Sequence, residues 1–350
     1  MRLLDNKLYK EDIDYVANID IDWSKLENKS VMITGASGMM GSFLIDVLMA
    51  KKDNLHCMVY ALGRNESKAK ERFVEYWDEE CFSFIAGDIN EGIHMDGIDV
   101  NYIIHAASNT HPVAYATDPI GTITTNIIGT HNLLEFAAAH NTERFVFASS
   151  NEIYGENRGD VEKFTEEYCG YINSNTLRAG YPESKRCGEA LCQAYIRQKG
   201  IDVVVPRLTR SYGPTMLMSD TKAISQFIRK GIAGENIVLK SEGTQFYSYT
   251  YVADAVAGLL TVMLRGETGE AYNIADEKSD ITLRDLAKLI ADINGTEVVF
   301  ELPDAVESAG FSKATKARLE SAKLQRIGWS AKYSIQEGMQ RTIEILKSLS

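Results

Sequence analysis

The chain has 350 residues, of which 45% are hydrophobic, and this length is enough for about two domains with a large core. Its 37 basic and 49 acidic residues give a net charge of -12, which disfavours nonspecific binding to nucleic acid or to an anionic membrane. Five cysteines without Cys-x-x-Cys spacing indicate neither a zinc site nor a disulfide framework. We therefore expect no metal. Because the sequence has no apolar leader and no long apolar run, we also expect a soluble, cytoplasmic protein.

The first predicted unit is an N-terminal arm over residues 1–29, which is polar with scattered apolar positions and predicts a short helix laid over the body. From residue 30 the pattern changes to alternating strands and helices. Buried strands are predicted at residues 31–34, 56–62, 82–86, 102–105, 145–148 and 203–206, with helix-length segments between them. This order predicts an α/β fold with a doubly wound parallel sheet, a Rossmann domain, over residues 30–207.

Past residue 207 the predicted elements become shorter. Strands are predicted near residues 237–240 and 272–274, and helices over 253–265 and 283–293. We predict a smaller, mixed α/β lobe over residues 208–350 that mainly binds substrate, with part of 250–275 returning to the first domain. Ligands of such sheets lie beyond the carboxyl ends of the strands, so the active cleft is expected between the two lobes.

Three glycines, spaced three residues apart, follow the first predicted strand and open a helix. Gly35 permits a tight turn, Gly38 lets the backbone approach a pyrophosphate, and Gly41 lets the helix pack against the sheet. The same turn contains Ser37, Met39 and Met40. In this strand-to-helix context the glycines predict a dinucleotide site.

The end of the second predicted strand bears on the choice of cofactor. An acid there would bond the ribose hydroxyls of NAD, whereas a basic residue accommodates the 2′-phosphate of NADP. The sequence has Arg64 and no acid there, which leans toward NADP, so NADP is the alternative to the expected NAD. Residues predicted to flank the dinucleotide follow the third and fourth strands, and they are Asp88, Ile89, Ala106, Ala107 and Ser108.

A Tyr-x-x-x-Lys pair supplies the clearest catalytic signal. Tyr181 and Lys185 would lie on one face of a helix, one turn apart, with the ammonium near the phenol. A neighbouring cation favours the phenolate, which can then remove a hydroxyl proton while a hydride departs. Ser150, directly after the fifth strand, can share a proton with the same hydroxyl. These residues predict a redox enzyme.

Residues 34–41, 126–130, 148–155 and 181–185 together resemble the extended short-chain dehydrogenase/reductase family, NAD-dependent epimerases and dehydratases that act on nucleotide sugars. The resemblance covers nearly all of the chain from residue 30. Within the family, the sequence is most similar to UDP-glucuronate decarboxylase and dTDP-glucose 4,6-dehydratase.

The resemblance implies a role for each matching residue. Tyr181 would be the base for the sugar C4 hydroxyl, Lys185 would bind the nicotinamide ribose and tune Tyr181, and Ser150 would hydrogen-bond the same hydroxyl. Glu152 matches an acid that reaches C5 in relatives. The resemblance also implies that Asn126 and Ser149 lie beside the cofactor, and that Ser108, Asn109 and Asn151 lie beside the substrate.

Four positions depart from the family pattern. Tyr247 replaces an arginine that meets the sugar carboxylate in decarboxylases, and Asn151 replaces the acid that dehydratases use to protonate the departing hydroxyl. Arg210 replaces an asparagine, and Thr215 stands where decarboxylases have an arginine. Two interpretations of Arg210 remain open, since it could bind the diphosphate or another substrate anion, or pair with an internal acid such as Glu152.

The sequence therefore predicts an enzyme that oxidises C4 of a nucleotide-diphospho-sugar, acts on the 4-keto intermediate and returns the hydride, as an epimerase or dehydratase. The alternatives are a UDP-glucuronate decarboxylase, an NADPH-dependent 4-keto-sugar reductase and, in another class, a non-catalytic nucleotide-binding regulator. The resemblance also implies a homodimer paired through helices at about 119–140 and 181–199.

Overall fold

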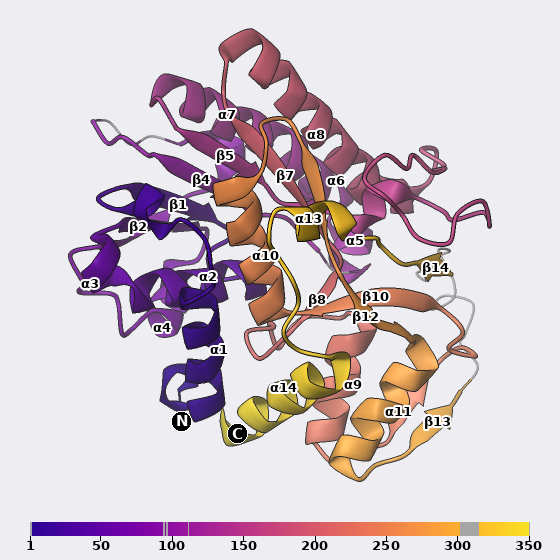
Figure 1. Ribbon diagram of the computed structural model, residues 1–350. Helices are drawn as coiled ribbons and strands as arrows, with labels where there is room; N and C mark the ends of the chain where they lie inside the picture. The colour runs from indigo at the N-terminus through magenta and orange to yellow at the C-terminus, as the bar shows by residue number, and fades with distance from the viewer. Residues whose placement is uncertain (1, 94, 96, 111, 302–314, 350) are drawn as a thin grey trace.

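The computed structural model describes residues 2–93, 95, 97–110, 112–301 and 315–349. Within these residues the main sheet is parallel, with the order β11-β7-β5-β4-β1-β2-β3, and β6 pairs with β7 (Figure 1). Its strands are β1 (Ser30–Thr34), β2 (Met58–Gly63), β3 (Phe82–Ala86), β4 (Tyr102–His105), β5 (Arg144–Phe147), β6 (Ser149–Ser150), β7 (Val203–Leu208) and β11 (Ala271–Ile274). The predicted doubly wound parallel sheet is confirmed.

Helices cover both faces of this sheet. On one face lie α2 (Met39–Ala50) and α10 (Val252–Arg265), and on the other lie α7 (Thr130–Ala139) and α8 (Gly180–Lys199). Because side chains of a strand alternate between faces, Val31 and Ile33 of β1 join one buried cluster while Met32 joins the other. The middle of β1, Val31–Ile33, is therefore apolar on both faces of the sheet.

The N-terminal arm packs against the first of these faces through α1 (Lys7–Ala17), which contacts α2 and α10. The buried carboxylate of Asp12 accepts hydrogen bonds from Arg341 at 2.9 Å and from Tyr251 at 2.5 Å. Arg341 belongs to α14 (Ile335–Leu349), the last helix of the described chain. The two ends of the chain consequently lie next to each other (Figure 1).

The second lobe is built around β10 (Phe246–Tyr251), which pairs with β12 (Asp276–Thr282), β14 (Lys316–Ala317) and β8 (Arg210–Tyr212). A separate parallel pair joins β9 (Ile237–Leu239) to β13 (Val298–Phe300). The amphipathic helices α9 (Ala223–Ile232) and α11 (Leu283–Asn294) pack on each other beside these strands. After this lobe has begun, the chain returns to the main sheet, where β11 pairs with β7.

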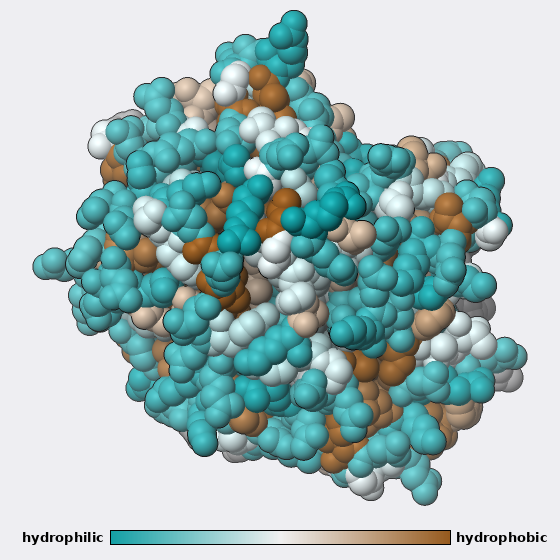
Figure 2. Space-filling model, in the orientation of Figure 1, coloured by the Kyte–Doolittle hydropathy of each residue, from teal (hydrophilic) through white to brown (hydrophobic). Residues whose placement is uncertain are grey.

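The remaining α-helices of the described chain are short. They are α3 (Lys52–Leu55), α4 (Glu66–Arg72), α5 (Pro112–Thr117), α6 (Pro119–Thr124) and α13 (Ala322–Arg326). A π-helical turn over Thr125–Gly129 joins α6 to α7, which makes one long interrupted helix. None of the described helices is long and apolar enough to cross a membrane. The face shown in Figure 2 is mostly hydrophilic, with apolar side chains in small separate patches.

Two differences from the predicted elements have local causes. The second strand begins at Met58 and not at residue 56, because His56 adopts a left-handed conformation (φ 48°) that ends α3. The β12 strand was not predicted, because its sequence, Asp276–Thr282, is polar and lacks apolar alternation. Its pairing with β10 gives it an extended structure that its own residue preferences do not favour.

Candidate active site

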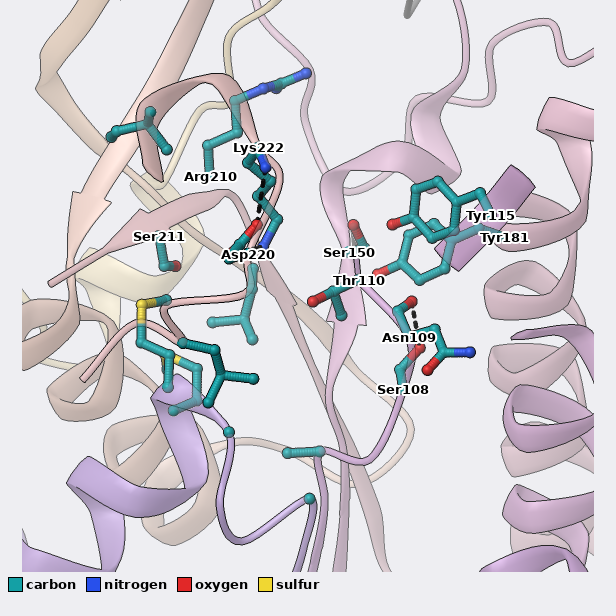
Figure 3. A pocket seen from close by; sticks show the side chains of 18 of the residues that line it. Ser108, Asn109, Thr110, Tyr115, Ser150, Tyr181, Arg210, Ser211, Asp220 and Lys222 are labelled. Carbon is teal, nitrogen blue, oxygen red and sulfur yellow. Dashed lines mark hydrogen bonds and ion pairs between the residues drawn. The ribbon is translucent and has the colours of Figure 1, made fainter. Parts of the chain in front are cut away.

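A cavity of about 840 Å³ runs from the glycine turn after β1 to the strands β8 and β10 of the second lobe. It is lined by the carboxyl ends of β1, β2, β4 and β6, where an open parallel sheet binds its ligands. In Figure 3, Tyr181 and Ser150 stand on one side of this cavity, and Arg210, Ser211 and the Asp220–Lys222 ion pair stand on the other.

The glycine turn closes the cavity at its cofactor end. Gly35 has a φ of +68°, and a Cβ there would lie 2.8 Å from the Ala106 carbonyl oxygen. At Gly41 a Cβ would lie 2.5 Å from the Gly35 carbonyl oxygen, so only glycine lets α2 begin this close to β1. The first residues of α2, Met39 and Met40, line the cavity. A helix N-terminus exposed to a cavity over such a turn fits the diphosphate of a dinucleotide.

Arg64 lines the same cavity beyond the end of β2, together with Asn65 and Lys68. Asn65 caps α4 through its side chain, which accepts a hydrogen bond from the Lys68 backbone N–H. Asp88 and Ile89 line the cavity from the segment after β3. These residues are placed to surround the adenosine half of a dinucleotide whose diphosphate lies at the glycine turn.

Tyr181 lies at the first turn of α8 and is almost fully buried. Its ring stacks on Tyr115 of α5, with 4.9 Å between the ring centroids. Burial and the charge of Glu152 raise the pKa of Tyr181, whereas a hydrogen bond from Ser150 and the charge of Arg178 lower it. Arg178 is therefore one cation that lowers this pKa, and the same role for Lys185 stays a prediction.

Lys185 is buried one turn further along α8. Its ammonium donates a hydrogen bond to the Ala148 carbonyl at 2.8 Å and lies 4.8 Å above the Phe147 ring. Burial lowers the pKa of this amine to about 8, while the charge of Glu189 opposes the shift. An ammonium has three donors, so Lys185 keeps donors for a ligand in the cavity that it lines.

Glu152 has a partner that the sequence did not reveal. Both of its carboxylate oxygens accept hydrogen bonds from Nη2 of Arg178 at 2.8 Å. The guanidinium of Arg178 also lies 4.8 Å from the centroid of the Tyr115 ring. The available signal was an arginine three residues before Tyr181, at the entrance to α8. Tyr115 gave no signal, since a single tyrosine in a short helix has no characteristic spacing.

Arg210 does not pair with Glu152, so the second interpretation of this arginine is wrong. Its guanidinium instead stacks on the Tyr247 ring at 3.5 Å from the centroid. The two side chains come from neighbouring strands, since β8 pairs in parallel with β10. Burial raises the pKa of Tyr247, and the positive charge of Arg210 opposes this shift.

The cavity brings together most of the residues that the sequence predicted for the site. Its lining includes Gly35, Ser37, Gly38, Met39, Met40, Gly41, Arg64, Asp88, Ile89, Ala106, Ala107, Ser108, Asn109, Ser149, Ser150, Asn151, Glu152, Tyr181, Lys185, Arg210 and Tyr247. Two predicted residues lie behind the wall. Asn126 is buried and donates to the Ser184 hydroxyl, and the Thr215 hydroxyl donates to the Met39 carbonyl at 2.9 Å. The Thr215 hydroxyl thus supports the first residue of α2, and its contact with a substrate stays a prediction.

His105 shows why a buried histidine need not be a ligand. Its two ring nitrogens lie 2.9 Å from the Thr34 hydroxyl and 3.0 Å from the Thr130 hydroxyl. Burial lowers the pKa of His105 well below its usual value, so the ring is neutral. Across the part of the chain that the structure describes, no cluster of histidine, cysteine and acidic side chains could hold a metal ion.

Residues 31–275 match the model of the NAD dependent epimerase/dehydratase family. UDP-glucuronic acid decarboxylase 1 of Xenopus tropicalis is 32% identical, over 93% of this chain and 73% of that protein.

Two solved structures share the fold. A dTDP-glucose 4,6-dehydratase of Streptomyces venezuelae, with NAD and TYD bound, superposes with a TM-score of 0.78 at 24% identity, covering 91% of this chain and 97% of that one. A UDP-glucuronic acid 4-epimerase of Bacillus cereus, in complex with UDP-glucuronic acid and NAD, gives 0.77 at 20% identity, covering 92% and 100%. These three similar proteins carry out three different reactions.

Proposed function

The chain belongs to the NAD-dependent epimerase/dehydratase family. We propose that it oxidises C4 of a nucleotide-diphospho-sugar, acts on the 4-keto intermediate and returns the hydride. One observation carries the proposal. The phenol of Tyr181 faces Ser150 on the wall of a single cavity that extends from a dinucleotide cradle to a second lobe. A nucleotide cofactor and a nucleotide sugar together need a cavity of this kind.

The residues of the chain would divide the work at C4. Tyr181 accepts the proton of the C4 hydroxyl, and Ser150 hydrogen-bonds the same oxygen and orients it. When bound, NAD accepts the hydride from C4 and later gives it back. Lys185 donates to the cofactor ribose with the donors that Ala148 leaves free. Arg64 stands where it could also meet a 2′-phosphate, so NADP remains the alternative cofactor, and a net 4-keto-sugar reductase would use it as NADPH.

The next step follows from the chemistry of a ketone. Oxidation at C4 acidifies the hydrogen on C5, and Glu152 is the carboxylate available to accept it. Asn151 cannot protonate a departing hydroxyl, because an amide is not an acid. This favours epimerisation, which needs no leaving group, over loss of water.

Decarboxylation is the second candidate. It is favoured by the similarity to the Xenopus tropicalis decarboxylase over 93% of this chain. A 4-keto group lies in a β position to a carboxylate on C5, so the same oxidation would allow carbon dioxide to leave. Tyr247 cannot supply the fixed charge that holds such a carboxylate in decarboxylases, so another cation must do so.

The test begins with the small molecules that the purified protein carries, identified by mass spectrometry after denaturation. The protein is then incubated with a panel of nucleotide sugars. We expect bound NAD and a product of unchanged mass, or a product lighter by carbon dioxide. A product lighter by water would contradict the assignment at Asn151. Stoichiometric consumption of added NADPH would point to the reductase, and failure to turn over any nucleotide sugar would favour a regulator.

We also propose that the protein forms a homodimer through α6, the π-helical turn and α8. Ile120 and Ile128 on these consecutive turns are 76% and 44% exposed, and Leu177 just before α8 is 64% exposed. Apolar side chains gathered on adjacent helices are typical of a protein interface. Light scattering should give twice the chain mass for the native protein and the single mass for an Ile120→Lys, Ile128→Lys variant.

A further inference from the structure

Two arginines that line the catalytic half of the cavity have hydrogen-bonding capacity that the described chain does not use. In both Arg178 and Arg210, the Nη1 atom is buried and has no hydrogen-bond partner among the described residues. Burying a guanidinium donor without an acceptor costs free energy, so such atoms indicate a group that is absent from the chain itself. Both arginines line the same cavity, which is where an acceptor from a ligand would bind.

The surroundings of Arg210 suit a planar anion. Its guanidinium lies flat on the Tyr247 ring, and a stacked guanidinium is held in place by its face while its edge stays available for donors. Among the described residues Arg210 has no ion pair. The edge of a guanidinium matches the two oxygens of a carboxylate in one plane.

The charges at this end of the cavity are not balanced. Glu152 offsets the charge of Arg178 through two hydrogen bonds from Nη2, which leaves Nη1 of Arg178 unused. The positive charge of Arg210 has no such partner. One further negative charge would neutralise the group formed by Arg178, Arg210 and Glu152.

We propose that Arg210, with Arg178 as a second donor, receives a carboxylate carried by the sugar ring of the substrate. The substrate is then a nucleotide-activated uronic acid, and this inference rests on the proposed function. The guanidinium of Arg178 lies 4.8 Å from the centroid of the Tyr115 ring, which in turn stacks on Tyr181, so this donor lies at the catalytic end of the cavity. The diphosphate has other cations available, because Lys222 and Lys230 line the cavity from the segment of α9.

The test compares two ligands that differ only in the carboxylate. Binding of UDP, dTDP, CDP, GDP and ADP to the full-length protein with its cofactor identifies the preferred nucleotide. The affinities of the hexose and the uronate attached to that nucleotide are then measured by calorimetry. We expect the uronate to bind tighter by roughly tenfold or more, as a charge-assisted hydrogen bond gives.

The variants Arg210→Gln and Arg210→Lys separate charge from shape. In Arg210→Gln the ratio of the two affinities should fall toward one, and Arg210→Lys should restore part of it, since lysine keeps the charge but loses the fork. The matched control is Arg318→Gln. Arg318 stacks in the same way on Phe246, the preceding residue of β10, at 4.6 Å, but does not line the cavity, so its loss should leave the ratio unchanged.

Other outcomes would overturn the proposal. Equal affinities in the native protein would exclude a carboxylate site, and so would a ratio that survives Arg210→Gln. If Arg210→Gln weakened hexose and uronate equally, Arg210 would bind the diphosphate. Turnover of a hexose that depends on Tyr181, without preference for the uronate, would remove this site and leave the proposed function intact. Failure of every nucleotide to bind would remove both.

Discussion

Arg178 holds both carboxylate oxygens of Glu152 through a single nitrogen, three residues before Tyr181. The pair carries opposite charges that act in opposite directions on the pKa of Tyr181, which Glu152 raises and Arg178 lowers. Burial is the largest influence on this pKa, and the ion pair of Arg178 with Glu152 adjusts it further. The sequence motif Tyr-x-x-x-Lys contains neither member of that pair.

The first prediction concerns the pH dependence of hydride transfer. The rate should rise with pH as Tyr181 loses its proton. Glu152→Gln removes the charge that raises its pKa, so the rise should move to lower pH by about one unit, and Arg178→Gln should move it to higher pH by a similar amount. Single-turnover absorbance of the reduced cofactor measures this step alone. Shifts in the same direction would contradict the roles assigned to the pair.

The second prediction concerns Tyr181 itself. Tyr181→Phe keeps the ring stacked on Tyr115 and removes the hydroxyl, so turnover should fall by about 10²–10⁴-fold, the usual contribution of a general base. Cofactor content and thermal stability should stay near those of the native protein. Tyr171→Phe is a suitable control, because Tyr171 is exposed and does not line the cavity. Full activity in Tyr181→Phe would disprove the assignment.

The third prediction concerns the glycine turn. Gly35→Ala forces a side chain into a φ of +68° and against the Ala106 carbonyl, so bound cofactor should be lost and stability should fall by about 1–3 kcal/mol. Gly200→Ala places the same strain, at φ +71°, where no atom lies within 4 Å. This control should lose about 1 kcal/mol and keep its cofactor. Cofactor content after purification and denaturant unfolding distinguish the two variants.

The fourth prediction concerns the buried amine of Lys185, whose pKa is lowered to about 8 from 10.5. Between these values the unfolded chain binds a proton that the folded chain has released. The free energy of unfolding should therefore rise with pH in this window, by up to about 1.4 kcal/mol per unit, for protein stripped of cofactor. Below it the buried charge is a constant cost, so Lys185→Met should be the more stable protein there.

Denaturant unfolding just below and within this window gives the slope for each protein. Lys185→Met should lose the part of the slope that this amine contributes. Lys7→Met, at a lysine whose side chain is 90% exposed, should keep the native slope. Equal slopes in all three proteins would show that Lys185 keeps its ordinary pKa in the folded chain.

The fifth prediction concerns the N-terminal helix. Asp12→Ala leaves Arg341 without its buried partner and Tyr251 without its acceptor, so the free energy of unfolding should fall by about 3–5 kcal/mol. Glu11→Ala removes an exposed partner of the same arginine, 3.3 Å away, and should cost less than about 1 kcal/mol. Similar losses in the two variants would mean that α1 is held by apolar packing alone.

The sequence predicted the parts of this molecule that depend on local chemistry. A window of a few residues is enough to identify the apolar strands of the main sheet, the glycine turn at Gly35 and the spacing of Tyr181 and Lys185. The parallel sheet and most of the cavity lining followed from them, because an open parallel sheet gathers its loops at one edge.

Contacts between segments that are distant in the sequence could not be predicted in this way. The pairing of Glu152 with Arg178 and the stacking of Arg210 on Tyr247 depend on how a loop enters α8 and on the register of β8 beside β10. Thr215 was expected at the substrate, and its hydroxyl bonds the Met39 carbonyl of a segment far away in the sequence. A single sequence records residue types but not such side-chain directions.

The return of the chain from the second lobe to β11 has a consequence for how specificity can change. Leu208 ends β7, and the chain rejoins the sheet at Ala271, which lies in register with Val205, so the intervening stretch leaves and rejoins the sheet at adjacent strands. Both Arg210 and Tyr247 lie within that stretch. Exchange of one contiguous gene segment between relatives would therefore replace the two residues together. The strands β7 and β11, which flank this segment, would stay paired in the main sheet.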